Sequence, residues 1–223
     1  RDVRYSLAPW MEYHKKMGVE RFLVYIEDES YEFAENLIGK HLVDGTARLI
    51  KFWFPDLSKV RDWRTQWAME LHCLYWARGR VRWLAYMDVD EYFDVRNGGL
   101  LPAFLTRYNY SSLSAVEARS AYWSYGSKAD QEMAFNATKR HPCDLACRQH
   151  YLEMNWRSKM ILSPENVIYM TPHKVTMGRD MHIADPDTEL RLVHASIHHS
   201  TFACAGNETW NDTFFKQSPG CAA

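Results

Sequence analysis

The stretch Trp83-Leu84-Ala85-Tyr86-Met87-Asp88-Val89-Asp90-Glu91-Tyr92 decides how this chain is interpreted. An apolar run is typical of a buried strand, and this one ends in three acids within four positions. Parallel strands of open α/β sheets are apolar along their length and carry ligand-binding groups at their carboxyl ends. Asp88 and Asp90 have the same parity on such a strand, so both side chains leave it on one side. Two carboxylates there can hold a hard divalent cation, and such a cation commonly also holds a diphosphate. The alternative is a polar strand-to-loop junction whose acids are solvated.

Size and charge narrow the class of protein. A chain of 223 residues with 47% hydrophobic residues is long enough for one sizeable, folded α/β domain. The net charge of −1 gives no bulk attraction to nucleic acid or to anionic lipid. No uninterrupted apolar stretch approaches the roughly 20 residues that span a bilayer. The chain opens with Arg1-Asp2-Val3-Arg4 and not with a signal peptide, so we expect any targeting or anchoring segment to lie outside it.

Helical and strand patterns alternate along the chain. Apolar residues at helical spacing, each group closed by a glycine, predict helices over residues 7–17, 31–43 and 60–78. Apolar runs predict strands over residues 21–26, 47–54 and 81–87, then over 114–123, 160–162, 167–170 and 190–197, with a short helix over 101–108. Strands that alternate with helices predict right-handed βαβ units in a mostly parallel sheet. We expect an α/β domain over residues 7–200 and a C-terminal tail over residues 201–223.

Cysteines and asparagines bear on the cellular compartment. Cys73 falls inside a helical pattern and is expected to be a buried apolar residue. The other cysteines could form two disulfides, although their pairing cannot be read from sequence: Cys143, Cys147, Cys204 and Cys221. Glycosylation acceptor patterns begin at Asn109, Asn136, Asn207 and Asn211. These patterns favour a lumenal or extracellular protein.

Two blocks of sequence are informative together. One is Trp10-Met11-Glu12-Tyr13-His14, followed by Gly18-Val19, and the other is Trp83 to Tyr92, with the pattern W-x-x-x-x-D-x-D-E-Y. Both resemble motifs of glycosyltransferase family 92 and its family-2-like relatives. Supporting blocks are Tyr125-Gly126-Ser127, Lys159 to Pro164, His173 and Ile197 to Ser200, the last with serine where the family pattern has tyrosine. The resemblance spans roughly residues 7–200 and implies a GT-A fold, a nucleotide-sugar donor and usually manganese.

The resemblance also implies a strand ahead of the W-x-x-Y-H helix, where it forms part of the nucleotide-base pocket. Only a handful of residues precede that helix here. We therefore expect a GT-A sheet without its first strand, with exposed sheet edges. On this interpretation the chain alone binds uridine diphosphate weakly, and a chain extended upstream binds it with manganese.

The acids can be assigned roles from their chemistry. Transfer of a sugar from a sugar diphosphate requires neutralisation of the leaving diphosphate, which a divalent metal provides as a Lewis acid. Asp90 is the expected direct metal ligand, and Asp88 shares the metal or binds ribose hydroxyls. Glu91 would hold a ligand in place. A histidine suits manganese as a third ligand, and the candidates are His199 and His173, each of which could instead be a satisfied core or surface residue.

Further residues are candidates for donor binding. Asp28 and Ser30 follow the predicted strand 21–26 and could bind the nucleotide base or ribose, or form an ordinary polar junction. Arg64 and Gln66 open the helix before the acidic stretch. Arg64 could reach a diphosphate oxygen, because guanidinium groups suit phosphates, although a solvated helix face is the commoner fate.

An inverting transferase also needs a general base for the acceptor hydroxyl. Asp130 and Glu132 are the best placed by order along the chain, and Glu117 is a third candidate.

The predicted function is metal-dependent transfer of a hexose from a nucleotide-diphosphate sugar, of the UDP-galactose kind, to a hydroxyl of a glycan or glycoconjugate. The expected place is the Golgi or another secretory-pathway lumen, with any membrane anchor outside this chain. Two alternatives remain. A metal-dependent phosphoesterase or nucleotidyltransferase also uses paired acids, although it usually needs more carboxylates for two metals. A non-catalytic carbohydrate-binding relic would keep the fold without the activity.

Overall fold

A computed structural model of the chain describes residues 3–27, 30–52, 63–124, 147–151, 157–195 and 218–221. Its first part is a βαβ unit with one additional helix. It comprises α1 (Val3–Lys16), β1 (Phe22–Glu27), α2 (Tyr31–Val43) and β2 (Ala47–Phe52). β1 and β2 are parallel, with Phe22 opposite Ala47 and Glu27 opposite Phe52. The predicted helix-linked parallel pair is therefore confirmed, and α2 is its crossover.

The acidic stretch has a different setting from the one predicted. After α3 (Trp63–Ala77), the expected strand over residues 81–87 is reduced to β3 (Leu84–Ala85). β3 is antiparallel to a later strand, with Leu84 opposite Leu162, and is not joined to β1 or β2. The chain turns after β3, and a new strand, β4 (Glu91–Val95), begins at the third acid. The prediction of a long strand parallel to β1 was wrong, because its residues pair with an antiparallel neighbour that lies far away in the sequence.

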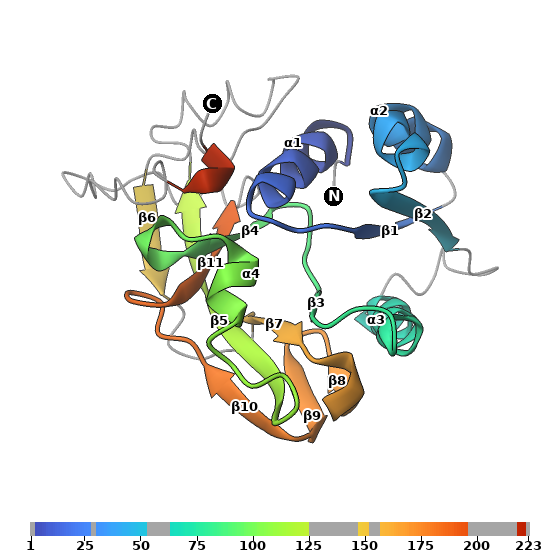
Figure 1. Cartoon of the computed structure of the whole chain (residues 1–223). Helices are drawn as coiled ribbons and strands as arrows, with labels where there is room; N and C mark the ends of the chain where they lie inside the picture. The colour runs from blue at the N-terminus through green and yellow to red at the C-terminus, as the bar shows by residue number, and fades with distance from the viewer. Residues whose placement is uncertain are drawn as a thin grey trace.

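The larger sheet is mixed. Its strands run in the order β3-β7-β5-β11-β4, and β10 and β6 are also paired with the long strand β5. Their bounds are β5 (Leu113–Ser124), β6 (Cys147–Tyr151), β7 (Lys159–Leu162), β10 (Asp180–Ile183) and β11 (Leu190–Ala195). β10 and β11 are parallel to β5, whereas β6 and β7 are antiparallel to it and β4 is antiparallel to β11. The α/β class is confirmed, but the sheet is not mostly parallel (Figure 1).

Shorter elements complete the described residues. They are η2 (Arg96–Gly98), α4 (Leu101–Leu105), η4 (Pro164–Asn166), the hairpin of β8 (Val167–Thr171) and β9 (Lys174–Gly178), and η5 (Pro219–Cys221). None of the helices in the described residues is long and apolar enough to cross a membrane. Cys73 is buried and free, as expected, and Cys221 takes part in a disulfide bond.

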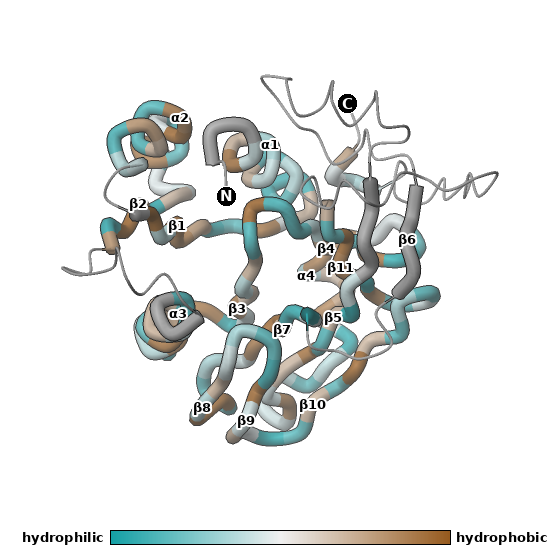
Figure 2. Tube along the Cα trace, turned by 180° about the vertical axis from the view of Figure 1, so that it is seen from behind, coloured by the Kyte–Doolittle hydropathy of each residue, from teal (hydrophilic) through white to brown (hydrophobic). Residues whose placement is uncertain are grey.

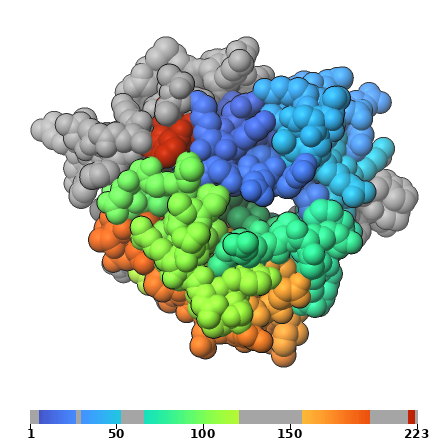
Figure 3. Space-filling model, in the orientation of Figure 1, coloured from blue at the N-terminus to red at the C-terminus, as the bar shows by residue number. Residues whose placement is uncertain are grey.

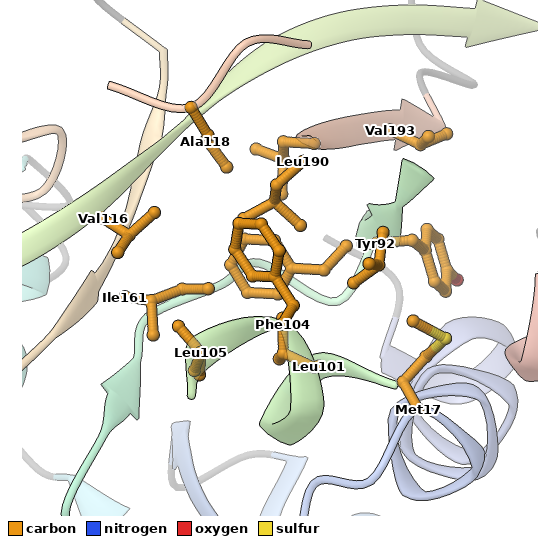
Figure 4. Close-up of a cluster of buried hydrophobic side chains, with 14 of the residues drawn as sticks. Met17, Tyr92, Leu101, Phe104, Leu105, Val116, Ala118, Ile161, Leu190 and Val193 are labelled. Atoms are coloured by element: carbon orange, nitrogen blue, oxygen red, sulfur yellow. The ribbon is translucent and has the colours of Figure 1, made fainter. Parts of the chain in front are cut away.

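Two apolar clusters meet at α1. One cluster joins α1, α2 and the β1–β2 pair through side chains such as Leu7, Val24 and Ile38. The other lies between α4 and the larger sheet, where Phe104 packs among residues of β4, β5 and β11 (Figure 4). Trp10 packs against both clusters. The tube in Figure 2 is brown over parts of the paired strands β4 and β11, and α1 lies between them and α2. Helix α1 therefore joins the two parts of the molecule.

Candidate active site

The acids form a turn between two strands. The Asp88 backbone N–H donates to Glu91 Oε2 at 2.8 Å, and the Glu91 backbone N–H donates to the Asp88 carbonyl at 3.0 Å. The turn is therefore closed from both ends by Asp88 and Glu91, and Asp90 lies between them. We call residues 88–91 the acid turn.

One side of the acid turn faces a buried lysine. Lys159 Nζ, on β7, lies 3.2 Å from Asp88 Oδ2 and 3.3 Å from Glu91 Oε2. The Lys159 side chain is 1% exposed. Burial lowers its pKa, but the carboxylates of Glu91, Asp88 and Glu70 more than offset that effect, and the net shift is upward. Lys159 is therefore a permanent internal cation that links two of the three acids.

The other side of the acid turn faces a histidine. Asp90 Oδ2 lies 3.4 Å from Nε2 of His194, which belongs to β11, and the Asp90 side chain is 16% exposed. The Ala195 backbone N–H donates to the Asp90 carbonyl at 2.8 Å, which fixes the turn against the end of β11. His194 Nδ1 also lies 3.8 Å from Glu91 Oε1. Asp88 and Asp90 therefore have different partners, one a lysine and the other a histidine.

Helix α3 adds a further acid near Lys159. Glu70 is buried, and burial raises its pKa to about 7, with Lys159 acting against that shift. Gln66 Nε2 donates to Glu70 Oε1 at 3.2 Å, and the Tyr86 hydroxyl donates to the Glu70 carbonyl at 2.5 Å. Burial likewise raises the pKa of Glu91 to about 7. The neighbourhood of Lys159 thus holds more carboxyl groups than one ammonium group can neutralise.

The chain is similar to known proteins over most of its length. A family model described as Glycosyltransferase family 92 matches residues 4–217 of this chain. The chain belongs to glycosyltransferase family 92. It is 27% identical over 160 residues to a glycosyltransferase family 92 protein of Ricinus communis, a match that covers 71% of this chain and 26% of the relative. It is 22% identical over 180 residues to one of Oryza sativa subsp. japonica, covering 80% and 28%. The chain spans about a quarter of the length of these curated relatives.

Three of the four predicted metal ligands lie within the described residues. Asp88 and Asp90 lie in the acid turn as described above. His173 lies just before β9, its Nδ1 is 3.0 Å from the Ser158 carbonyl, and burial lowers its pKa. Asp88 and Lys159 both act on the His173 ring electrostatically. His199 lies outside the described residues. Within the described part of the chain, no three His, Cys, Asp or Glu residues are grouped as a metal site.

Some of the other predicted site residues of this family 92 domain lie within the described residues and some lie outside them. Ser30 directly precedes α2 and makes no side-chain capping bond there. Gln66 faces Glu70, and Arg64 lies in the first turn of α3, where its side chain is not described. Glu117 lies on β5 and is buried, and burial raises its pKa. Asp28, Asp130 and Glu132 lie outside the described residues.

Three residues near the acids were not predicted as site residues. His194 and Lys159 each lie in a short strand whose residues are all buried, and Glu70 lies on the long amphipathic helix. Lys159 is the first residue of β7, and the sequence predicted that strand only from residue 160, so the burial of this charge was not expected. What sequence could not give is the register that sets His194 opposite Glu91.

Proposed function

We propose that this chain carries the metal and diphosphate site of a glycosyltransferase that moves a hexose from a nucleotide-diphosphate sugar to a glycan hydroxyl. The observation that carries the proposal is the pairing of Asp90 with His194 at a partly exposed position beside a buried internal cation. Family membership supports glycosyl transfer as the reaction class. Because the chain spans about a quarter of its relatives, the activity is proposed for the whole protein to which it belongs.

The donor atoms fit manganese. A carboxylate together with an imidazole is a ligand set that suits Mn²⁺, and metals in diphosphate sites commonly take few protein ligands, with phosphate oxygens and water completing the set. Asp90 and His194 would hold the metal, and His173 or His199 stays a candidate for a further ligand. When bound, such a metal supplies Lewis-acid stabilisation of the leaving diphosphate.

Of the two roles predicted for Asp88, we propose the binding of ribose hydroxyls. Its carboxylate is already paired with Lys159, so it is better suited to accept hydrogen bonds from ribose or sugar hydroxyls than to serve as the main metal ligand. Glu91 is more deeply buried, with 2% of its side chain exposed, and holds the turn through the Asp88 backbone N–H. Asp28, Ser30, Arg64 and Gln66 remain proposed donor-binding residues, with a UDP-sugar of the galactose kind as the proposed donor.

The base and the compartment also stay proposals. Asp130, Glu132 and Glu117 remain the candidates for the base that deprotonates the acceptor. The disulfide bond at Cys221 supports an oxidising compartment such as the Golgi lumen. Asn109, the first glycosylation acceptor, is exposed in a turn, where a glycan could be accommodated.

The test is a substitution of the proposed ligand in the full-length protein. Asp90→Asn keeps the size of the side chain and removes its charge. We expect manganese-dependent hydrolysis or transfer of a UDP-sugar to fall by roughly 100-fold or more, because the metal supplies several kcal/mol of charge stabilisation. Asp180→Asn, an exposed acid on β10, is the matched control and should leave the rate unchanged.

The same assay separates the alternatives. Cleavage of bis(p-nitrophenyl) phosphate by the wild type, without use of any sugar nucleotide, would favour a phosphoesterase. Binding of a glycan with no turnover of any donor in a panel of nucleotide sugars would favour a carbohydrate-binding relic. Equal manganese affinity in the wild type and in Asp90→Asn would contradict the metal assignment.

A further inference from the structure

β4 is the end strand of the larger sheet. It follows β11 in the strand order, and among the described residues no further strand lies beyond it. In an antiparallel pair, alternate residues direct both their N–H and C=O groups to the same neighbour, so the other residues direct theirs away from it. An end strand therefore presents a row of backbone groups that need partners. On β4 this row starts at Glu91, the last residue of the acid turn.

Side chains of α1 bind this row of backbone groups. The Trp10 indole N–H donates to the Glu91 carbonyl at 2.9 Å. The Tyr13 hydroxyl donates to the Phe93 carbonyl at 2.9 Å, and the Phe93 backbone N–H donates to His14 Nε2 at 3.4 Å. Little more than one helical turn thus occupies the place of a neighbouring strand.

The chemistry of His14 fits this arrangement. Its Nδ1 lies 2.8 Å from the Trp10 carbonyl, an atom that can only accept, so Nδ1 carries the proton and Nε2 is the acceptor for Phe93. Burial lowers the pKa of His14 to about 4, which keeps the ring neutral. The ring also stacks on Tyr92 at a centroid distance of 5.7 Å, and Tyr13 meets Tyr92 edge-on at 5.2 Å. The edge of β4 that faces away from β11, and the Tyr92 ring, are therefore held by α1 next to the acids.

We infer that Trp10, Tyr13 and His14 are positioning residues for the acid turn and act through the backbone of β4. The inference rests on the proposed function, because the turn they position is the proposed metal and diphosphate site. The Trp10 bond ends at the residue that follows Asp90, so the helix sets where the Asp90 carboxylate lies relative to His194. A site of this kind needs its ligands held closely, and loss of such outer support typically weakens metal binding by 10–100-fold.

The experiment uses two tryptophans with matched chemistry in the full-length protein. Trp10→Phe removes the indole N–H that binds Glu91 and keeps a smaller aromatic side chain at this position. Trp67→Phe is the control, because the Trp67 indole N–H also donates to a backbone carbonyl, that of Met170 on β8. For each variant we would measure the manganese dissociation constant by calorimetry, the melting temperature, and amide hydrogen exchange over residues 90–93.

The two variants should behave differently. We expect Trp10→Phe to speed exchange over residues 90–93 and to raise the manganese dissociation constant by about tenfold or more. Trp67→Phe should lower the melting temperature by about as much as Trp10→Phe does. It should leave the exchange rate over residues 90–93 and the manganese dissociation constant within about twofold of the wild type. A second pair adds a rescue. His14→Gln keeps an acceptor for Phe93 and should retain most of the manganese affinity, whereas His14→Phe removes the acceptor and should not.

Each outcome decides the question. If exchange rises in Trp10→Phe but manganese affinity does not change, the contact is structural and the positioning role is overturned. If exchange does not change at all, the contact itself is overturned. If the wild type binds no manganese, the proposed function fails separately from the contact. In that case an unchanged exchange rate in Trp10→Phe would overturn the α1 contact. A raised exchange rate would show that α1 holds the acid turn but that the turn is not a manganese site, which overturns the proposed positioning role.

Discussion

At the scale of single residues, Lys159 is the most consequential side chain near the acids. It carries a full charge with 1% of its side chain exposed, and it touches both Asp88 and Glu91. A buried charge is tolerated only when its partners are in place, since each group alone would face a large desolvation cost. Lys159 and the acid turn therefore depend on each other for stability.

Replacement of this lysine tests that dependence. Lys159→Met keeps an unbranched side chain that is one heavy atom shorter and leaves the two carboxylates without their shared cation. We expect the free energy of unfolding to fall by about 3–5 kcal/mol, measured by denaturant titration. Lys40→Met is the control, because Lys40 forms an exposed pair with Glu12 at 2.6 Å, and such pairs contribute about 1 kcal/mol or less. Equal losses in the two variants would mean that Lys159 behaves as a surface charge.

At the scale of elements, the prediction from sequence was best where contacts are local. The helix over residues 31–43 was predicted to its last residue, because its apolar spacing and the closing Asp44-Gly45 are local signals. β1 and β2 followed for the same reason, since a short helical crossover requires a parallel pair. The strand over residues 114–123 was also found, because a long run of alternating and apolar residues suits few other structures.

The prediction failed where pairing is distant. β3 takes its partner from β7, more than 70 residues later, and no local pattern could show that the run at residues 81–87 would turn rather than extend. β4 was not predicted, because the predicted strand ends at residue 87 and no second strand was expected directly after the acids. The prediction of the candidate site was incomplete for the same reason. Asp88, Asp90 and His173 were predicted from spacing and motif, whereas His194 required the register between β4 and β11.

The packing of α1 on β4 depends on a neutral His14. Burial lowers the pKa of His14 to about 4, while an unfolded chain takes up the proton near pH 6.5. The unfolded state therefore binds more protons as pH falls below about 6.5, and stability decreases down to about pH 4, by roughly 3 kcal/mol in total. His14→Gln should lose this part of the pH dependence. Chemical denaturation of both proteins between pH 4 and pH 7 measures it, and parallel pH profiles would show that His14 is not buried in its neutral form.

At the scale of the whole molecule, α1 connects parts that are distant in sequence. It packs on the β1–β2 pair on one side and on the larger sheet on the other. In the space-filling view, the surface is hollowed between the blue residues of this first part and the teal residues of α3 (Figure 3). The last described element, η5, also packs on α1, because Gly220 lies against the Tyr13 ring. Ser218, the residue before η5, has its Oγ 3.0 Å from the Tyr13 hydroxyl, 205 positions away. The two ends of the described chain are thereby joined at one helix.

The addition of a methyl group at Gly220 tests the contact between η5 and α1. A Cβ added at Gly220 would overlap the ring of Tyr13, which is fully buried and also bonds to β4. We expect Gly220→Ala to lower the free energy of unfolding by about 1–3 kcal/mol, as overpacking usually does. Gly39→Ala, in helix α2, is the control. Nothing lies within 4 Å of its added Cβ, and alanine should stabilise the helix by up to about 1 kcal/mol. Thermal melts of both variants that shift in the same direction would contradict this packing.

The bonds from α1 end on main-chain atoms of β4, and this has a consequence for how substitutions are tolerated. A carbonyl or an amide is the same in every residue except proline, so these bonds place no demand on which amino acids stand at positions 91 and 93. They demand a specific donor or acceptor at positions 10, 13 and 14. The bonds at this edge of the sheet therefore depend on the residue types in α1 and not on those in β4. In a saturation library, position 93 should accept other large apolar residues, while position 10 should accept few.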